Sequence, residues 1–289
     1  MLRLALFLIS AISCFAQTRT VALTFDDLPP EDKTINKRIL DALAKHHAWA
    51  IAFVNEKNVA PRGEAMLQDW ITRGLDLGNH TYSHRDLNQM TVDEFKDEVI
   101  RGERTVVQLA GQPKYFRFPF NHSGDTREKH DAVAAFLAAR GYRVATCTID
   151  NEDYRYSHAY DAMLARKDGT AAAKLRAEYL AYTAAEIDYY SQLHVRVFGR
   201  EIPHVMLLHG NELNAELIDR LLQIFEDKHY RFVTLDAAQS DAAYKTPDTY
   251  VTKFGPMWGY RWAAQLGIKV DGRLESEPSA WILNYVDQK

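Results

Sequence analysis

Short apolar runs alternate with amphipathic segments along most of this chain. Runs of strand length occupy residues 20–25, 49–54, 75–78, 115–118, 142–149, 204–208 and 231–235. Between them, apolar positions at three- and four-residue spacing predict helices over residues 36–43, 63–73, 91–110, 127–140 and 215–227. Strands that alternate with helices form βαβ units around a parallel sheet. About seven such units favour an α/β fold, an incomplete (β/α) barrel of about seven parallel strands, over an open sheet.

Residues 1–16 have the pattern of a secretory signal peptide. Arg3 supplies the positive charge, residues 4–12 form an apolar core too short to span a bilayer, and residues 14–16 offer cleavage positions. We therefore expect a secreted or periplasmic protein without a transmembrane segment, whose single folded domain spans residues 17–289. The alternative is a lipoprotein signal in which Cys14 carries the lipid.

The composition is that of an ordinary globular protein, with 47% hydrophobic and 26% charged residues. A formal net charge of −4 provides no overall attraction to nucleic acid or to anionic membranes, so we expect no nucleic-acid partner. Cleavage after Ala16 would leave Cys147 as the remaining cysteine, which excludes an intramolecular disulfide. The core must then hold the fold together even in an oxidising compartment. The oligomeric state stays open.

Polar residues gather directly after five of the predicted strands. The clusters are Asp26-Asp27, His80-Thr81-Tyr82-Ser83-His84, Arg117-Phe118-Pro119-Phe120, Asp150-Asn151-Glu152-Asp153-Tyr154 and His209. The parallel strands of a barrel end at one edge, where barrel enzymes carry their active sites. Since scattered polar residues would not sort in this way, the clusters predict one shared site.

The spacing of His80 and His84 predicts a metal site within that region. A helical turn or a tight loop can aim side chains four residues apart at one point. Two imidazoles joined by one carboxylate, with positions left open, are a recurring catalytic arrangement for zinc that other divalent metals tolerate. We assign Asp27 as this carboxylate. The alternative, a histidine pair on a surface helix, is disfavoured by the position at the end of a strand.

Asp26 is then the free neighbour of the metal carboxylate. Adjacent residues of a strand point to opposite faces, so Asp26 and Asp27 are expected to do different jobs. Asp26 can take a proton from water that the metal activates, and Arg117 can hold Asp26 ionised through a bidentate contact. His209 as an imidazolium can protonate a leaving group, and a carboxylate such as Asp153 can keep it charged. Taken alone, a histidine after an apolar strand is more often a core residue.

In this order, the five clusters resemble the five motifs of the NodB-homology polysaccharide deacetylases, over about residues 20–236. The resemblance implies a distorted (β/α) barrel that removes N- or O-linked acetyl groups from a glycan with a divalent metal, Zn²⁺ or a similar ion such as Co²⁺, Ni²⁺ or Mn²⁺. It implies that Asp26 is the general base and that Arg117 orients it. The implied metal ligands are Asp27, His80 and His84.

The resemblance also implies roles for residues that the pattern alone leaves open. The backbone N–H of Phe120 helps to hold the oxyanion, and Asp153 tunes His209, which acts as the general acid. Tyr154 and Leu207 match positions of the acetyl pocket. This chain departs from the family pattern in having Leu28-Pro29-Pro30 in place of Gly-Pro, Phe120 in place of Tyr and Tyr154 in place of Trp. These departures leave the metal ligands intact and bear on the substrate more than on the reaction.

The substrate that the resemblance implies is an acetylated poly- or oligosaccharide of a cell wall or of the environment. Two alternatives stay open. The chain could be a barrel that binds carbohydrate on aromatic loops without catalysis. It could also be a metal-dependent hydrolase of an amide that is not a sugar derivative.

One connection is too long for an ordinary loop of such a fold. Residues 155–203 form an insertion between the fifth and sixth predicted strands, and residues 170–197 have the pattern of a long helix. The stripe of this helix consists of Leu175, Tyr179, Tyr182, Glu186, Tyr189 and Leu193. We prefer the interpretation that the helix packs on the barrel, although a lid or a wall for stacking sugar rings also suits tyrosine. Residues 237–289 form a C-terminal extension without assignable chemistry.

Overall fold

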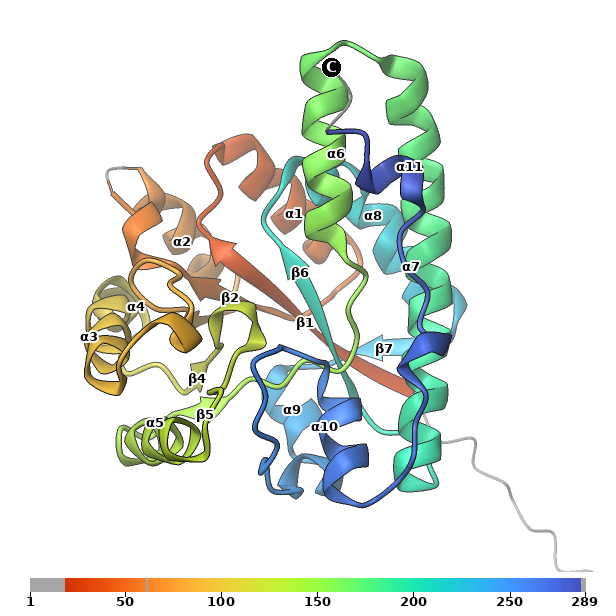
Figure 1. The fold of residues 1–289 in the computed structure, drawn as a ribbon. Helices are drawn as coiled ribbons and strands as arrows, with labels where there is room; N and C mark the ends of the chain where they lie inside the picture. Colours follow the sequence, from red (N-terminus) through yellow and green to blue (C-terminus); the bar gives the residue numbers. More distant parts are fainter. Residues whose placement is uncertain (1–18, 61, 287–289) are drawn as a thin grey trace, which may run out of the picture.

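Seven parallel strands form one curled sheet at the centre of the molecule (Figure 1). The computed structural model describes residues 19–60 and 62–286, so the predicted signal peptide lies outside the described residues. The strands follow the order β5-β4-β3-β2-β1-β6, and β7 pairs with β1. Their bounds are β1 Arg19–Leu28, β2 Ala50–Val54, β3 Asp76–Asn79, β4 Tyr115–Phe116, β5 Arg143–Val144, β6 His204–His209 and β7 Tyr230–Phe232. The sheet is a half-barrel wrapped by helices, which confirms the predicted fold class.

Helices connect these strands and cover the outside of the sheet (Figure 1). They are α1 (Lys33–Lys45), α2 (Gly63–Thr72), α3 (Val92–Gly102), α4 (Arg104–Ala110), α5 (Arg127–Ala139), α6 (Asp153–Ala165), α7 (Gly169–Phe198), α8 (Glu212–Asp227), α9 (Leu235–Gln239), α10 (Trp258–Gln265) and α11 (Ala280–Leu283). Short 3-10 turns lie at Glu56–Asn58, Leu87–Gln89, Pro119–Asn121, Ala242–Lys245 and Gly272–Leu274. The N-termini of four connecting helices are capped by the side chains of Asp32, Thr91, Thr126 and Asn211.

Strand β1 is the centre of the core. Val21, Leu23 and Phe25 on it are fully or almost fully buried, and so is Ala22 between them. The strand pairs with β2, β6 and β7, so its backbone groups are satisfied on both sides. Each buried Val, Leu or Phe side chain stabilises the fold by about 1.5–3 kcal/mol. The carboxyl end of β1 is therefore a fixed platform for whatever side chains it carries.

The prediction of one continuous helix over residues 91–110 is wrong, because the chain breaks within this range. The chain forms α3 and α4, which are separated at Glu103. The carboxylate of Glu103 accepts a hydrogen bond from the Tyr142 hydroxyl at 2.6 Å and pairs with Arg140. These partners lie about 40 residues further along the chain. The spacing of apolar residues within the segment therefore could not predict the break, which depends on tertiary contacts.

The predicted fifth strand is also shorter than residues 142–149. Regular pairing covers only Arg143 and Val144, and Ile149 forms an isolated bridge with Met206 of β6. The chain between these points passes from one edge strand of the sheet to the other. Trp258 of the C-terminal extension donates its backbone N–H to the carbonyl of Cys147 in this crossing segment, at 3.0 Å. An irregular crossing thus spans the gap where a closed barrel would have further strands.

The insertion consists of two helices that lie side by side along one flank of the sheet, α6 and α7 (Figure 1). The predicted helix over residues 170–197 is confirmed as α7, whereas α6, which begins at Asp153, was not predicted. Within the stripe, Leu175, Tyr179, Glu186 and Leu193 are buried. The hydroxyl groups of Tyr182 and Tyr189 contact residues of the C-terminal extension. This burial agrees with packing on the barrel rather than with an exposed wall.

No helix within residues 19–60 and 62–286 combines the length and the apolar character that a membrane span requires.

Helix α3 packs its last residue, Gly102, directly on the loop that follows β3. A Cβ atom at Gly102 would lie 2.4 Å from the carbonyl carbon of Thr81 and 2.7 Å from its Cα. We expect Gly102→Ala to lower the free energy of unfolding by about 1–3 kcal/mol, because the Thr81 backbone must move. Urea unfolding measures this change. The control is Gly169→Ala in α7, where the added methyl group meets nothing within 4 Å. Equal stabilities of the two variants would contradict the packing described here.

Candidate active site

Asp26 and Asp27 reach the same point in space from the end of β1. We predicted opposite faces for them, and the structure corrects this. The register between β1 and β2 shifts between Phe25 and Leu28, and Asp27 has a left-handed backbone with φ of 62°. Such a bulge re-aims one side chain of a strand. As a result, the Nε2 atom of His80 lies 3.7 Å from an oxygen of each carboxylate.

Asp27, His80 and His84 converge as the sequence predicted. Their candidate ligand atoms all lie within 4.8 Å of one another. The Oδ1 atom of Asp27 lies 3.7 Å from His80 Nε2 and 3.5 Å from His84 Nε2. Two ligands at about 2.1 Å from one tetrahedral ion lie roughly 3.4 Å apart. The spacing of these atoms therefore fits a shared divalent cation.

The protonation of these groups fits a cation as well. The Nδ1–H group of His80 donates to the carbonyl of Arg117 at 2.9 Å, which leaves the lone pair of Nε2 facing Asp27. Burial lowers the pKa of His80 to about 3, so the ring is neutral, as a metal ligand must be. The Oδ1 atom of Asp27 is buried and accepts no hydrogen bond from the described residues. A buried carboxylate oxygen of this kind calls for a partner, which a cation supplies.

Arg117 is fully buried and is held by groups from β1, from β2 and from the crossing segment that contains Cys147. It donates to Asp26 Oδ2 at 3.3 Å and to the Thr24 hydroxyl at 3.0 Å, and it contacts the Cys147 sulfur. Its guanidinium also lies over the ring of Phe53, 4.8 Å from the ring centre. Burial raises the pKa of Asp26 above its ordinary value, and Arg117 opposes this rise. The pairing agrees with the predicted contact, although the hydrogen bond to Asp26 is single rather than bidentate.

Cys147 lies behind Arg117 and is fully buried without a disulfide. Burial raises the pKa of its thiol to about 12.

His209, on the strand that pairs with β1, forms a close pair with Asp153. The Nδ1 atom of His209 lies 2.6 Å from Asp153 Oδ1, and the backbone N–H of His209 donates to Asp153 Oδ2 at 2.7 Å. Burial alone would lower the pKa of His209, but the Asp153 carboxylate outweighs it and raises this pKa to about 10. The imidazole is therefore charged at neutral pH. Asp26 and His209 are directly opposite each other in the pairing of β1 with β6.

The three residues expected at the oxyanion and acetyl positions surround these groups. Phe120 is 55% exposed, and its ring packs edge-on against that of His84 at 4.7 Å. Its N–H lies in the first turn of a 3-10 helix, where amides have no partner within the helix. Tyr154 is 49% exposed with its ring 6.3 Å from that of His209. Leu207 is buried two residues before His209, on the same face of β6.

Left-handed backbone conformations cluster at this site. The φ angles are 62° at Asp27, 55° at His84, 56° at Phe120 and 53° at Glu152. Each such residue costs of order 1–2 kcal/mol unless the surroundings fix it, and such strain concentrates at functional sites. Four strained loops therefore meet at one edge of the sheet.

The sequence did not reveal several residues that support the site. Thr24 holds Arg117, and Asn214 contacts both members of the His209–Asp153 pair. Arg261 of the C-terminal extension is buried and donates to Ser123 at 2.8 Å and to the backbone carbonyl of Asn121, next to Phe120. In the sequence, Asn214 and Arg261 could have been found only as polar residues at positions that the helical pattern places on the buried side of α8 and α10.

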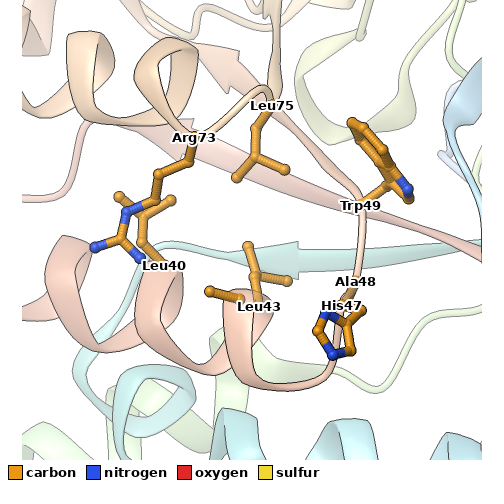
Figure 2. A pocket seen from close by; sticks show the side chains of 8 residues that line it. Leu40, Leu43, His47, Ala48, Trp49, Arg73 and Leu75 are labelled. Carbon is orange, nitrogen blue, oxygen red and sulfur yellow. The ribbon is translucent and has the colours of Figure 1, made fainter.

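Two hollows differ in what they offer to chemistry. A cavity of about 380 Å³ adjoins His84 and Phe120 and is also lined by Arg85 and His122. A separate pocket of about 260 Å³ lies between the end of α1 and the beginning of β2, where Leu43, Trp49 and Leu75 line it (Figure 2). It lies at the amino ends of the strands and has no carboxylate in its lining. Of these two hollows, the first adjoins His84, one of the three candidate metal ligands.

The sequence is similar to those of known deacetylases. Residues 16–145 match the family model described as "Polysaccharide deacetylase". A peptidoglycan-N-acetylglucosamine deacetylase of Bacillus cereus is 30% identical over 136 residues, which are 47% of this chain and 46% of that protein. A chitin deacetylase of Colletotrichum lindemuthianum is 27% identical over 233 residues, 78% of this chain and 82% of that protein. The chain thus spans about half the length of the first of these relatives.

Solved structures show the same fold. A polysaccharide deacetylase from Bacillus cereus superimposes with a TM-score of 0.57 at 20% identity, over 75% of this chain and 91% of that one. A family 4 carbohydrate esterase from Streptomyces lividans in complex with acetate gives 0.54 at 17% identity, over 76% and 95%. A pseudoenzyme of the same family from Bacillus anthracis gives 0.56 at 16% identity, over 77% and 66%. The fold alone therefore does not decide whether a chain is catalytic, and the residues must.

We expect His84→Ala to lose the bound divalent ion, because only two of the three ligands remain. The affinity should fall by more than about 100-fold, the upper end of the losses caused by outer-shell changes. Elemental analysis of the purified protein after gel filtration measures the metal content. His122→Ala is the control, because His122 lines the same cavity but bonds to Asp86 instead. Metal retained by His84→Ala at the wild-type level would show that the site is elsewhere.

Proposed function

We propose that this chain is a deacetylase of the polysaccharide deacetylase family that its residues 16–145 match, and that it hydrolyses N- or O-linked acetyl groups of a carbohydrate with the help of a divalent metal. The observation that supports this most directly is the convergence of Asp27, His80 and His84 beside two further groups, Asp26 and His209. The first three fit a cation, Asp26 has a carboxylate oxygen without a hydrogen-bond partner among the described residues, and His209 is held charged by Asp153.

The metal would be held by Asp27, His80 and His84, and we propose Zn²⁺ because two imidazoles and one carboxylate suit it. When bound, such an ion supplies a Lewis acid that makes water a nucleophile near neutral pH. The remaining chemistry falls to side chains. The Oδ1 atom of Asp26 is buried and has no hydrogen-bond partner within the described residues, so it is placed to accept the proton of the attacking water. Arg117 holds the other oxygen of this carboxylate and fixes its orientation.

The departing group leaves with a proton from His209. Because Nδ1 faces Asp153, the proton available for transfer is on Nε2. Asp153 keeps the ring charged until the leaving amine or alkoxide takes that proton. The Phe120 N–H donates to the carbonyl oxygen as it gains negative charge, and Leu207 with Tyr154 encloses the acetyl methyl group.

The substrate class follows from the shape of the site and from the names of the relatives. Phe120 beside His84 and Tyr154 beside His209 present exposed aromatic rings, and such rings offer flat apolar contacts to sugar rings. Chitin and peptidoglycan-N-acetylglucosamine stand in the names of two relatives. We propose an acetylated poly- or oligosaccharide outside the cytoplasm. The location rests on the pattern of residues 1–16 alone.

Acetate release from an acetylated chitooligosaccharide, peptidoglycan fragments and acetyl-xylan tests the function directly. We expect release that a chelator abolishes and that added Zn²⁺ restores. Asp26→Asn should keep the metal and lower kcat by about 10²–10⁴-fold, the range for loss of a general base. Asp41→Asn, at an exposed position in α1, is the control. Metal-bound wild type that releases no acetate from any of these substrates would favour a binding protein.

The dependence of kcat/KM on pH tests the two protonation states. The rate should rise as Asp26 loses its proton, at a pH above the ordinary range of an aspartate because burial raises its pKa. It should fall as His209 loses its proton near pH 10. Asp153→Asn removes the charge that holds this proton, so the alkaline limb should move down by more than about two pH units. Asp131→Asn, at an exposed position, should leave both limbs in place. An alkaline limb that Asp153→Asn does not move would assign it to another group.

A further inference from the structure

The Asp153 carboxylate is fully buried and is shared between the strand that carries His209 and the helix that follows it. Its Oδ1 atom faces His209 Nδ1, and its Oδ2 atom accepts both the His209 backbone N–H and the side-chain amide of Asn214. The Nδ2 group of Asn214 also donates to the carbonyl of His209 at 2.9 Å. Asn214, in the first turn of α8, therefore bridges the acid and its carboxylate.

Asn214 is in turn held by the inserted helix. The hydroxyl of Tyr179 in α7 donates to Asn214 Oδ1 at 2.6 Å and accepts from Asn151 Nδ2 at 2.8 Å. The other contact of the Asn151 amide is the hydroxyl of Thr183, one turn further along α7, at 3.0 Å. All of these side chains are buried. A continuous chain of hydrogen bonds thus leads from α7 to His209.

We propose that Tyr179, acting through Asn214, is a positioning residue for the Asp153–His209 pair, so that the insertion is part of the machinery that orients the general acid. The inference rests on the proposed function for its kinetic consequence. It assigns to the insertion a role other than the packing or the lid that the sequence suggested, and it places that role on one hydroxyl group.

The direction of the hydrogen bonds determines which way the Asn214 side-chain amide points. A buried amide can turn by 180°, and only one orientation of Asn214 presents N–H groups to Asp153 and to the His209 carbonyl. Asn151 donates to the Tyr179 hydroxyl, so this hydroxyl has its own proton left to give, and it gives it to Asn214 Oδ1. The Asn214 amide is thereby fixed with its N–H groups toward Asp153. Without the hydroxyl, the opposite orientation would set a carbonyl oxygen against a carboxylate.

The effect on the acid follows from the burial of the network. In a low-dielectric interior, satisfied hydrogen bonds are strong and unsatisfied ones are costly, so a change at one end is felt along the chain. A carboxylate that loses the Asn214 amide must find another donor or shift, and His209 shifts with it. A proton donor displaced by a fraction of an ångström transfers its proton less efficiently while substrate binding is unaffected.

The test replaces single groups and separates kcat from KM in acetate release. Tyr179→Phe should lower kcat about tenfold with KM changed less than about twofold, since the hydroxyl acts only on the orientation of the acid. Asn214→Leu, similar in shape, should lower kcat by about 100-fold. In the Asn214→Leu background, Tyr179→Phe should cost nothing further, because both act through one contact. The matched control is Tyr190→Phe, since Tyr190 is also buried in α7 but bonds to Glu275.

A second readout does not depend on turnover. In protein labelled with ¹⁵N-histidine, the Nδ1–H proton and the ring nitrogens of His209 report its hydrogen bond to Asp153. Tyr179→Phe should move these resonances, whereas Tyr190→Phe should not. Unchanged resonances in Tyr179→Phe, wild-type kcat, or additive losses in the double variant would each overturn the positioning role. Wild type without acetate release would instead overturn the proposed function, and the resonances would still decide the inference.

Discussion

Charge buried at the end of β1 is the constraint on which the site depends. Asp26 and Arg117 are both withdrawn from water, and removing one partner of such a pair costs about 3–5 kcal/mol. Thr24 and Phe53 complete the surroundings of the guanidinium from the same sheet. The second pair joins His209 at the end of the neighbouring strand β6 to the buried Asp153 at the beginning of α6. The rigid core of the sheet thus fixes two oppositely charged groups at a set separation, and the strained loops are arranged around them.

The sequence predicted the parts of this arrangement that local patterns carry. Asp26, His80, Arg117 and His209 were correctly expected near the carboxyl ends of strands, because apolar runs and the polar residues after them are local features. The bounds differ, since β1 continues through Asp26 and Asp27 to Leu28 and β4 already ends at Phe116. The parallel sheet follows from the alternation of strands with helices. The orientation of Asp27 did not follow, because a bulge depends on how β1 registers with β2. For the same reason, period-two reasoning alone could not bring two adjacent carboxylates to one histidine.

What the sequence missed depends on partners distant along the chain. The break between α3 and α4 is stabilised by Tyr142 and Arg140, and the fifth strand gives way to a crossing segment whose partners are β6 and the C-terminal extension. Asn214 lies 61 residues from Asp153 and 35 from Tyr179. No periodicity links such positions, and they become meaningful only when the fold brings them together. The insertion and the C-terminal extension support the site through buried hydrogen bonds, from Tyr179 to Asn214 and from Arg261 to the backbone carbonyl of Asn121.

The burial of Cys147 has a consequence for the compartment in which this chain would work. Exchange with a disulfide requires the thiolate, and at neutral pH a group that titrates near 12 supplies almost none of it. The guanidinium of Arg117 and the packed crossing segment also block the approach of another sulfur. Among proteins that are forming their own disulfides, this cysteine would stay reduced and uncoupled. Burial alone therefore protects the Cys147 thiol from forming mixed disulfides with other proteins.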